Sequence, residues 1–264
     1  CTAGPEVSLT DFDVEVVAYL SDGIDKLRAA SDTKAFPTLG GGPELLLLGV
    51  RSAATRCQPV VMGVDKGALR SKADETVSLC VAHRAADLLL QARGTSPCWD
   101  APVILDPMCG VGTYLLALNW VLSRRGLGGA SLLGVDLDEE TVGLVRANVG
   151  RLSGNQPPGV LRGACERLPI RSSSVDLIVV DPPWGQRHST HNYVKRNFRK
   201  WAREWARVLR PGGAAIIVTI CKKVFEDQVL PPLRGEGLLD LEESVQFDNK
   251  GWTVCRLYVA RRPL

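Results

Sequence analysis

One string of residues has the composition of a site that acts on a planar amine. Asp181-Pro182-Pro183-Trp184-Gly185 follows Val175–Val180, an almost unbroken apolar and β-branched run interrupted only by Asp176. Two successive prolines and an aromatic residue at the end of a buried strand are unusual choices for structure alone. The Asp181 carboxylate and the Pro182 carbonyl would both accept hydrogen bonds from an amine whose lone pair is delocalised into a ring, and would pull its nitrogen towards sp3 geometry. We therefore expect amine activation here, with Pro183 helping to hold that carbonyl rigid.

Beside these acceptors, the Trp184 ring offers a flat face on which a nucleobase can stack, a contact that contributes about 1–3 kcal/mol. Gly185 follows it and is expected to border the acceptor. The alternative is a purely structural one, a proline-stiffened turn in which Trp184 fills the core. The chemical reading explains the carboxylate, the prolines and the aromatic ring together, whereas the structural one leaves Asp181 without a purpose.

A second string contains the residues of a nucleotide-binding loop. Asp106-Pro107-Met108-Cys109-Gly110-Val111-Gly112-Thr113 follows the short apolar segment Val103–Leu105. Its glycines let the backbone approach a ligand closely, and the N-terminus of the next helix offers free N–H groups. Asp136 ends the next apolar segment, at about the offset at which an acid accepts hydrogen bonds from the hydroxyls of a ribose. A glycine pair alone also occurs in plain strand-to-helix turns, but the accompanying acids favour a nucleotide.

The ligand predicted by this loop is S-adenosylmethionine. Dinucleotide-binding loops usually carry a third glycine, but position 115 is leucine. A carboxylate at Asp106 would repel phosphates and attract a cationic amino acid group. An adenosine attached to an amino acid satisfies both conditions. Methyl transfer from a sulfonium to an amine requires no general base beforehand, so most of the rate should come from alignment of the reactants.

Short strands and helices are predicted to alternate through the rest of the chain. The predicted strands are Val103–Leu105, Ser131–Val135, Val160–Arg162, Val175–Val180 and Ala214–Ile220, and the predicted helices are Ala73–Ala92, Thr113–Ser123, Glu139–Leu152 and Asn192–Leu209. This alternation is typical of an α/β fold with a doubly wound parallel sheet, in which ligands lie beyond the carboxyl ends of the strands. The tail predicts a hairpin of Leu238–Phe247 and Trp252–Ala260 that adds antiparallel strands at one edge. Upstream, we expect strands at Leu45–Val50 and Pro59–Val64, and a strand leading into a helix within Phe12–Ala30.

Together the two strings resemble the methyltransferase domain of the THUMP-domain-containing RNA guanine-N2 methyltransferases. The Asp-Pro-Met-Cys-Gly string at residues 106–110 is fairly specific to that family, and Gly67-Ala68-Leu69-Arg70 is similar to the segment that precedes its cofactor loop. The resemblance covers about Leu69 to the C-terminus. It implies a Rossmann-like class I fold with a mostly parallel seven-stranded sheet, and S-adenosylmethionine as the cofactor.

The resemblance also implies which residues hold the cofactor. The expected contacts are Asp106, Pro107, Cys109, Gly110, Gly112 and Thr113, with Asp136 and the adjacent Leu137 at the adenosine. The family usually has an acid after the glycine of its third motif, whereas here Gly163 is followed by Ala164 and Cys165. We expect Glu166 to take that place, the alternative being an adenine held through backbone atoms only.

The domain organisation follows from the extent of the resemblance. No THUMP domain fits within residues 1–68, so we interpret these as an N-terminal extension and residues 69–264 as the methyltransferase domain. The sequence begins at Cys1 rather than at methionine, which suggests a piece of a longer protein. Members of the family in eukaryotes commonly work with a small zinc-binding activator subunit, and the resemblance implies such a partner here.

The region after Gly185 predicts contact with RNA. The net charge of +3 does not by itself indicate a nucleic-acid binder, but eight basic residues are opposed only by Glu204 in this region: Arg187, Lys195, Arg196, Arg199, Lys200, Arg203, Arg207 and Arg210. We expect Arg187, Lys195 and Arg196, the nearest to Asp181, to contact the phosphates of the substrate. Trp201 and Trp205 have helical spacing and are expected to be buried against the sheet.

Several other classes of protein are disfavoured. No apolar run is long enough to span a membrane, and no secretory signal opens the sequence. The eight cysteines include no Cys-x-x-Cys pair, so we expect reduced thiols in a reducing compartment, the cytoplasm or the nucleus. His188 and His191 have no further ligand candidates nearby, and no metal site is expected.

The acceptor is the part of the function that stays open. The first expectation is guanine N2 in a tRNA or small nuclear RNA. Adenine N6 and the amide of a protein glutamine are alternatives, because the same pair of hydrogen-bond acceptors, Asp181 and the Pro182 carbonyl, would bind all three planar amines. A non-catalytic RNA-binding or scaffold protein is the alternative from a different class. A nicotinamide oxidoreductase is disfavoured by the missing third glycine and by Asp106.

Overall fold

The structure, a computed structural model, describes residues 14–20, 46–52, 73–92, 101–150, 152, 157–184, 190–249 and 253–264. The chain divides into two compact units, Cys1–Pro59 and Val60–Leu264. In the first, β1 (Val14–Leu20) pairs antiparallel with β2 (Leu46–Ser52), so strands lie where two were predicted. The helix predicted after the first strand and the strand predicted at Pro59–Val64 lie outside the described residues.

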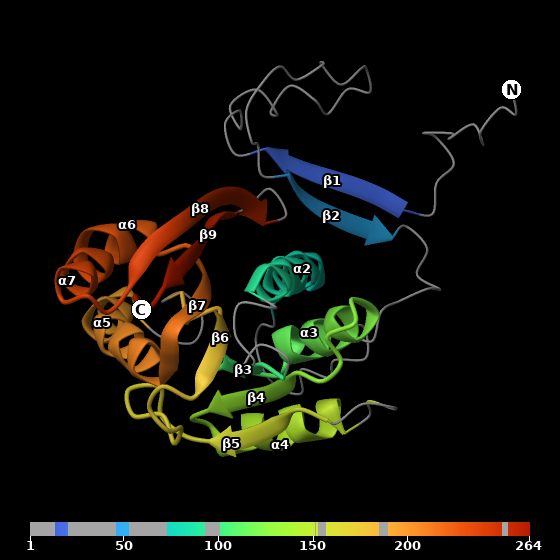
Figure 1. Cartoon of the computed structure of the whole chain (residues 1–264), viewed down its shortest axis with the longest axis horizontal. Helices are drawn as coiled ribbons and strands as arrows, with labels where there is room; N and C mark the ends of the chain where they lie inside the picture. The colour runs from blue at the N-terminus through green and yellow to red at the C-terminus, as the bar shows by residue number, and fades with distance from the viewer. Residues whose placement is uncertain are drawn as a thin grey trace, which may run out of the picture. The chain divides into compact units, whose positions relative to one another are not determined.

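The second unit is built on a seven-stranded sheet with the order β5-β4-β3-β6-β7-β9-β8 (Figure 1). Neighbours from β5 to β7 are parallel, and β9 pairs antiparallel with both β7 and β8. This confirms the predicted doubly wound, mostly parallel sheet with a C-terminal hairpin. The strands are β3 (Val103–Asp106), β4 (Ser131–Asp136), β5 (Gly159–Arg162), β6 (Val175–Val180), β7 (Leu209–Thr219), β8 (Asp240–Asn249) and β9 (Thr253–Arg261).

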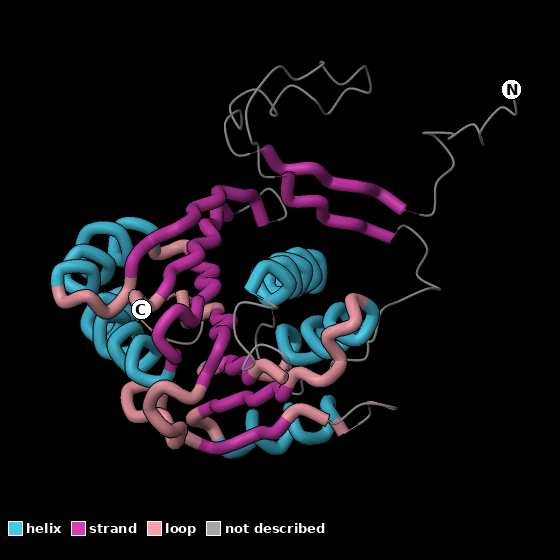
Figure 2. The backbone as a smooth tube through the Cα atoms, viewed as in Figure 1, coloured by secondary structure: helices cyan, strands magenta, loops and turns pink. Residues whose placement is uncertain are grey.

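Helices cover both faces of this sheet (Figure 2). They are α2 (Glu75–Ala92), α3 (Thr113–Arg124), α4 (Glu139–Val149), α5 (His191–Val208), α6 (Lys222–Val224), the π-helical turn η3 (Phe225–Val229) and α7 (Leu230–Gly235). Residues of α2, α3 and α4 share one apolar core, and residues of α5 to α7 share the other. The segment from α6 to α7 was not predicted, because it is short and lacks a clear apolar period. The prolines at the start of α7 are compatible with a helix only because they lie in its first turn.

The central strand β6 is buried at every position. Leu177 and Val179 face the core under α2 and α3, while Ile178 and Val180 face the core under α5. Because successive side chains alternate between the two faces, a strand covered on both sides needs apolar residues at nearly every position, and the one polar residue of β6, the buried Asp176, pairs with Arg210. The strand therefore ends abruptly at Asp181, the first polar residue after the run.

The long helix α5 is strongly two-sided. Its buried face carries Val194, Phe198, Trp201 and Trp205, each at most 1% exposed, against the sheet. The rings of Phe198 and Trp205 meet edge to face at 6.0 Å. This confirms the structural interpretation of the two tryptophans and leaves the charged face of the helix for other contacts.

A substitution of Gly112, in the turn that leads into α3, tests the packing of the fold. Gly112 has φ +88°, and a Cβ at this position would lie 2.6 Å from Val145 Cγ2 of α4. We expect Gly112→Ala to lower the free energy of unfolding by about 2–4 kcal/mol, because a left-handed backbone and an overpacked contact both penalise alanine. Thermal and urea unfolding without any ligand would measure this.

Gly143 provides a matched control. It lies on the exposed side of α4, and a Cβ there would meet no atom within 4 Å in the part of the chain that the structure describes. Gly143→Ala should raise stability by up to about 1 kcal/mol, because alanine is the better helix former. Equal effects of the two substitutions would contradict the assigned packing.

Candidate active site

Three aspartates lie at the carboxyl ends of three parallel strands. Asp106 ends β3, Asp136 ends β4 and Asp181 follows β6, and β3 lies between the other two in the sheet. Burial raises the pKa of all three carboxyls, and the charges of Asp136 and Asp181 add to the rise at Asp106. No ion pair formed within the described residues involves any of the three. In their ionised forms the three carboxylates give the site a negative potential that a cationic ligand group would relieve.

Asp106 is the most enclosed of the three, at 1% exposure. Its carboxylate accepts a hydrogen bond from the Met108 amide at 3.1 Å, and its pKa is raised well above the ordinary value, mainly by burial. Two neighbouring hydroxyls, those of Thr113 and Tyr114 at the start of α3, are buried without a regular hydrogen bond to any described residue. Buried polar groups are usually satisfied, so these hydroxyls are available as donors to a bound ligand or to a neighbouring carboxylate.

The glycine loop is tied to the neighbouring strand. The Cys109 amide donates to the Val135 carbonyl at 2.9 Å, and the Gly110 amide donates to Asp136 Oδ2 at 3.0 Å. Gly110 has φ +51°, and no atom of the described residues lies within 4 Å of the position that a Cβ would take. The loop is thus fixed to β4 on one side, and the space beside the Gly110 Cα suits close approach of a ligand to the backbone.

Cys109 packs inward from this loop. A Cβ on Gly134 of β4 would lie 2.9 Å from the Cys109 sulfur, so the loop rests directly on that strand. Burial raises the pKa of the Cys109 thiol well above its ordinary value. A buried thiol that stays protonated is no nucleophile, which leaves its backbone as the part available to a ligand.

Asp136 and Leu137 present one polar and one apolar group side by side. Asp136 Oδ1 accepts from the Asp138 amide at 3.0 Å, so the carboxylate is held by both the loop and its own turn. Leu137 is 63% exposed, unusual for a large apolar side chain. Asp138 has a different task, since it caps α4 by accepting from the Thr141 amide at 2.8 Å.

Asp181 is bound by its own loop. The Trp184 indole N–H donates to Asp181 Oδ1 at 2.6 Å. Burial raises the pKa of Asp181 to about 7, while hydrogen bonding by Trp184 and Tyr114 acts in the opposite direction. Pro182 is buried and Pro183 half-buried, and the Cys221 thiol donates to the Trp184 carbonyl at 3.6 Å. The loop is therefore held on both sides of the prolines.

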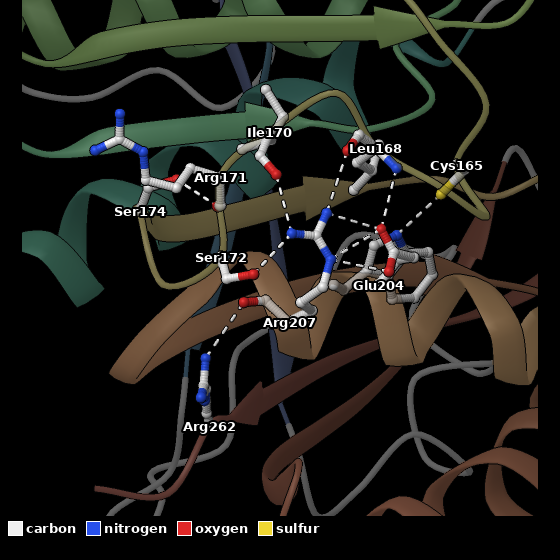
Figure 3. Close-up of polar contacts among 10 residues, drawn as sticks. Cys165, Leu168, Ile170, Arg171, Ser172, Ser174, Glu204, Arg207 and Arg262 are labelled. Carbon is white, nitrogen blue, oxygen red and sulfur yellow. Dashed lines mark hydrogen bonds and ion pairs between the residues drawn. The ribbon is translucent and has the colours of Figure 1, made fainter.

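Glu166 lies in a turn that is pinned to α5. Its Oε1 accepts from the Trp201 indole N–H at 2.9 Å. Figure 3 shows how Arg207 binds the same segment, with its guanidinium reaching the Glu204 carboxylate and the carbonyls of Leu168 and Ile170. The position of Glu166 is thus well determined, and its predicted contact with an adenine stays a prediction.

The basic run on α5 is less free than the sequence suggested. Arg199 and Arg203 both pair with Glu236, Arg207 pairs with Glu204, and Arg210 pairs with the buried Asp176. Glu204 is the only acid between Arg187 and Arg210, but Glu236 and Asp176 come from other parts of the chain and pair with three of these arginines.

Lys195 and Arg196 differ from the arginines that follow them on α5, and resemble Lys200 in forming no ion pair with a described residue. Both are exposed near the start of α5, and neither forms an ion pair with a described residue. The other predicted substrate residues, Gly185 and Arg187, lie outside the described residues, as does His188.

The described residues contain no group of histidine, cysteine or acidic side chains arranged to hold a metal ion. Likewise, none of the described helices combines the length and the apolar character needed to cross a bilayer. One residue of the site was missed from the sequence, Tyr114, whose hydroxyl is a polar group within the apolar stretch at residues 114–118. Because the stretch has the apolar pattern of a buried helix, Tyr114 resembles one more core residue in the sequence.

Comparison with known proteins now identifies the domain. Residues 95–230 match the family described as RMKL-like, methyltransferase domain. The chain belongs to this family. Its fold is similar to that of a Listeria monocytogenes protein assigned to the class I S-adenosylmethionine-dependent methyltransferases, with a TM-score of 0.58, 15% identity and coverage of 78% of this chain and 65% of that one.

Two curated relatives are RNA methyltransferases by name. The chain is 31% identical over 170 residues to the tRNA (guanine(6)-N(2))-methyltransferase THUMP3 of Mus musculus, covering 61% of this chain and 32% of that protein. It is 30% identical over 118 residues to the U6 snRNA (guanine-N(2))-methyltransferase THUMPD2 of Bos taurus, covering 44% of this chain and 21% of that protein. The chain thus spans a third or less of the length of these relatives.

Asp136 and Asp138 give a matched test of the cofactor half of this methyltransferase domain. Asp136→Ala should weaken binding of S-adenosylhomocysteine by about tenfold or more, since it removes a carboxylate that also holds the glycine loop. Asp138→Ala should cost about 1 kcal/mol of stability through loss of the helix cap, with affinity retained within a few-fold. Calorimetric titration of both variants measures the difference, and equal losses of affinity would remove Asp136 from the site.

Proposed function

We propose that residues 69–264 form a domain that transfers a methyl group from S-adenosylmethionine to an exocyclic amine, guanine N2 of an RNA. The observation that carries this proposal is the placement of Asp181 and Pro182 at the end of β6, next to the glycine loop at the end of β3. In parallel sheets this edge is where ligands bind, so cofactor and acceptor would meet between the two loops.

The residues of the loop suit this cofactor. Bound S-adenosylmethionine supplies an electrophilic methyl group on a sulfonium. The cluster of Asp106, Asp136 and Asp181 favours a cationic ligand, and the open space above Gly110 admits one close to the backbone. We assign the ribose to Asp136 and an adenine contact to Leu137, whose exposed side chain would lose water on binding. Glu166 is the proposed polar contact to the adenine.

The acceptor half acts on the amine by hydrogen bonding. Asp181, in its ionised form, and the Pro182 carbonyl accept from the amine hydrogens, which localises the nitrogen lone pair towards the methyl group. Because burial raises the pKa of Asp181 to about 7, the carboxyl is part protonated at neutral pH, and only the ionised form accepts in this way. Trp184 contributes a ring for stacking with the base.

Guanine N2 is favoured over the other planar amines by the relatives, whose names specify that atom in a tRNA and in U6 snRNA. Adenine N6 and glutamine amide remain the alternatives, because Asp181 and Pro182 would serve them equally. An RNA of either kind would place the protein in the cytoplasm or the nucleus. We also propose a small zinc-binding activator subunit as partner, on the strength of the resemblance to this family.

Substitution of Asp181 should affect catalysis and leave cofactor binding largely unchanged. We expect Asp181→Ala to lower kcat by about 100-fold or more, as loss of a preorganised polar contact to the reacting group does, with cofactor affinity within a few-fold of wild type. Single-turnover transfer from labelled cofactor and calorimetric titration measure the two quantities. A variant that no longer binds the cofactor would show that Asp181 has been assigned the wrong role.

The acceptor is identified by transfer of label to total cellular RNA, followed by nucleoside analysis, with and without the activator subunit. Label in N2-methylguanosine supports the proposal. Label in N6-methyladenosine keeps the mechanism and changes the acceptor. Label confined to protein would favour the glutamine alternative.

Lys195 and Arg196 provide a test of RNA contact. We expect the double change Lys195→Ala and Arg196→Ala to weaken RNA binding for all sequences and to reduce the slope of log affinity against log salt by about one to two units. The double change Arg199→Ala and Arg203→Ala is the control, because these residues pair with Glu236. A larger loss of salt dependence in the control would place the RNA on that part of the helix instead.

A further inference from the structure

The Asp181 carboxyl is approached by two side-chain donors from different elements. Trp184, three residues along the same loop, donates its indole N–H to Oδ1 at 2.6 Å. Tyr114, the second residue of α3, is close enough for its hydroxyl to lower the pKa of Asp181 by hydrogen bonding. A base-stacking role for position 184 needs only an aromatic ring, and of the aromatic side chains without a titrating ring only tryptophan also offers a ring N–H.

Tyr114 is placed where its hydroxyl can only donate. The side chain is 4% exposed, and its hydroxyl forms no hydrogen bond of regular geometry with any described residue. The titratable groups around it are Asp181, Asp106, Asp74 and Cys255, all acids, and together with burial they raise the pKa of the phenol well above its ordinary value. A phenol that stays protonated among carboxylates serves them as a donor.

We propose that Trp184 and Tyr114 are a pair of positioning residues that hold the Asp181 carboxylate with Oδ2 turned to the acceptor amine. This inference rests on the proposed function, in which Asp181 accepts from that amine. Trp184 occupies Oδ1, so the amine takes the other oxygen. The Tyr114 hydroxyl, which is buried and has no hydrogen-bond partner among the described residues, is the second donor that we assign to this carboxylate from the side of α3.

The pair would also set the pH at which the enzyme works. Burial disfavours the charged form of Asp181, and a protonated carboxyl would offer a donor where the amine needs an acceptor. Both hydrogen bonds favour the ionised form, while the neighbouring Asp106 carboxylate, when charged, opposes it. Removal of either donor should therefore raise the pKa of Asp181 and deplete the active form at neutral pH, but not at alkaline pH.

Two conservative substitutions test this on methyl transfer. Trp184→Phe keeps a ring for stacking, Tyr114→Phe removes one oxygen, and each should move the acid limb of the kcat/KM profile upward by about one pH unit. At pH values on the acid limb, kcat/KM of each variant should be about tenfold below that of wild type, and it should recover towards the wild-type value near pH 9. Trp120→Phe and Tyr258→Phe, which change the same side-chain types away from Asp181, should leave the limb in place. A loss that is equal at every pH would show a merely structural role and overturn the proposal.

A second measurement does not depend on activity. In protein labelled with ¹⁵N at tryptophan, the indole resonance of Trp184, assigned by its absence in Trp184→Phe, should shift with pH as Asp181 titrates. Asp181→Asn should abolish the shift, and Tyr114→Phe should raise its midpoint. An indole resonance that does not change between pH 5 and 9 overturns the pairing with Asp181, and an unchanged midpoint in Tyr114→Phe overturns the role of Tyr114.

The two measurements separate the inference from the proposed function. Suppose that the Trp184 indole resonance shifts with pH as expected but no guanine is methylated. The positioning of Asp181 by Trp184 and Tyr114 is then supported, and the assignment of the acceptor fails. If guanine is methylated but the Trp184 indole resonance does not shift with pH, the proposed function stands and the inference fails.

Discussion

The central constraint on this domain is the crowding of three carboxylates at one edge of a buried sheet. Asp106, Asp136 and Asp181 end three parallel strands whose order brings them together, and no described basic side chain neutralises them. Burial raises the pKa of all three carboxyls, and the charges of Asp136 and Asp181 add to the rise at Asp106, so the ionised forms are unfavourable until a cation arrives. A site of this kind exchanges some stability of the free protein for affinity towards a positively charged ligand.

Much of the fold was predictable because its signals are local. The run Val175–Val180 has the composition of a central strand, and the strand occupies those residues. The two loops that begin at Asp106 and Asp181 were also found from sequence, since their prolines and glycines have few other uses. Long amphipathic helices such as α5 follow from their apolar period.

The features that were missed depend on contacts between distant residues. Glu236 neutralises Arg199 and Arg203 from a segment that had no predicted helix, so the charge of α5 was overestimated. Tyr114 looked like one more core residue of α3, because nothing in its neighbourhood along the chain reveals that its hydroxyl lies near Asp181. A spacing pattern records which face of an element is apolar, and it does not record which groups from other elements arrive there.

The order of strands in the sheet has a consequence for how the domain folds. β3 pairs with β4 on one side and with β6 on the other, although β4 and β5 both separate β3 from β6 in the chain. The β3–β6 pairing is therefore a contact of high sequence separation, and loop-closure entropy must be overcome before it forms. The cofactor loop can assemble on β3 and β4 early, but Asp181 joins it only when β6 has inserted between β3 and β7. A nascent chain that ends before residue 175 would carry half of a binding site and none of the groups that act on the amine, so methyl transfer would begin only once the central strand is in place.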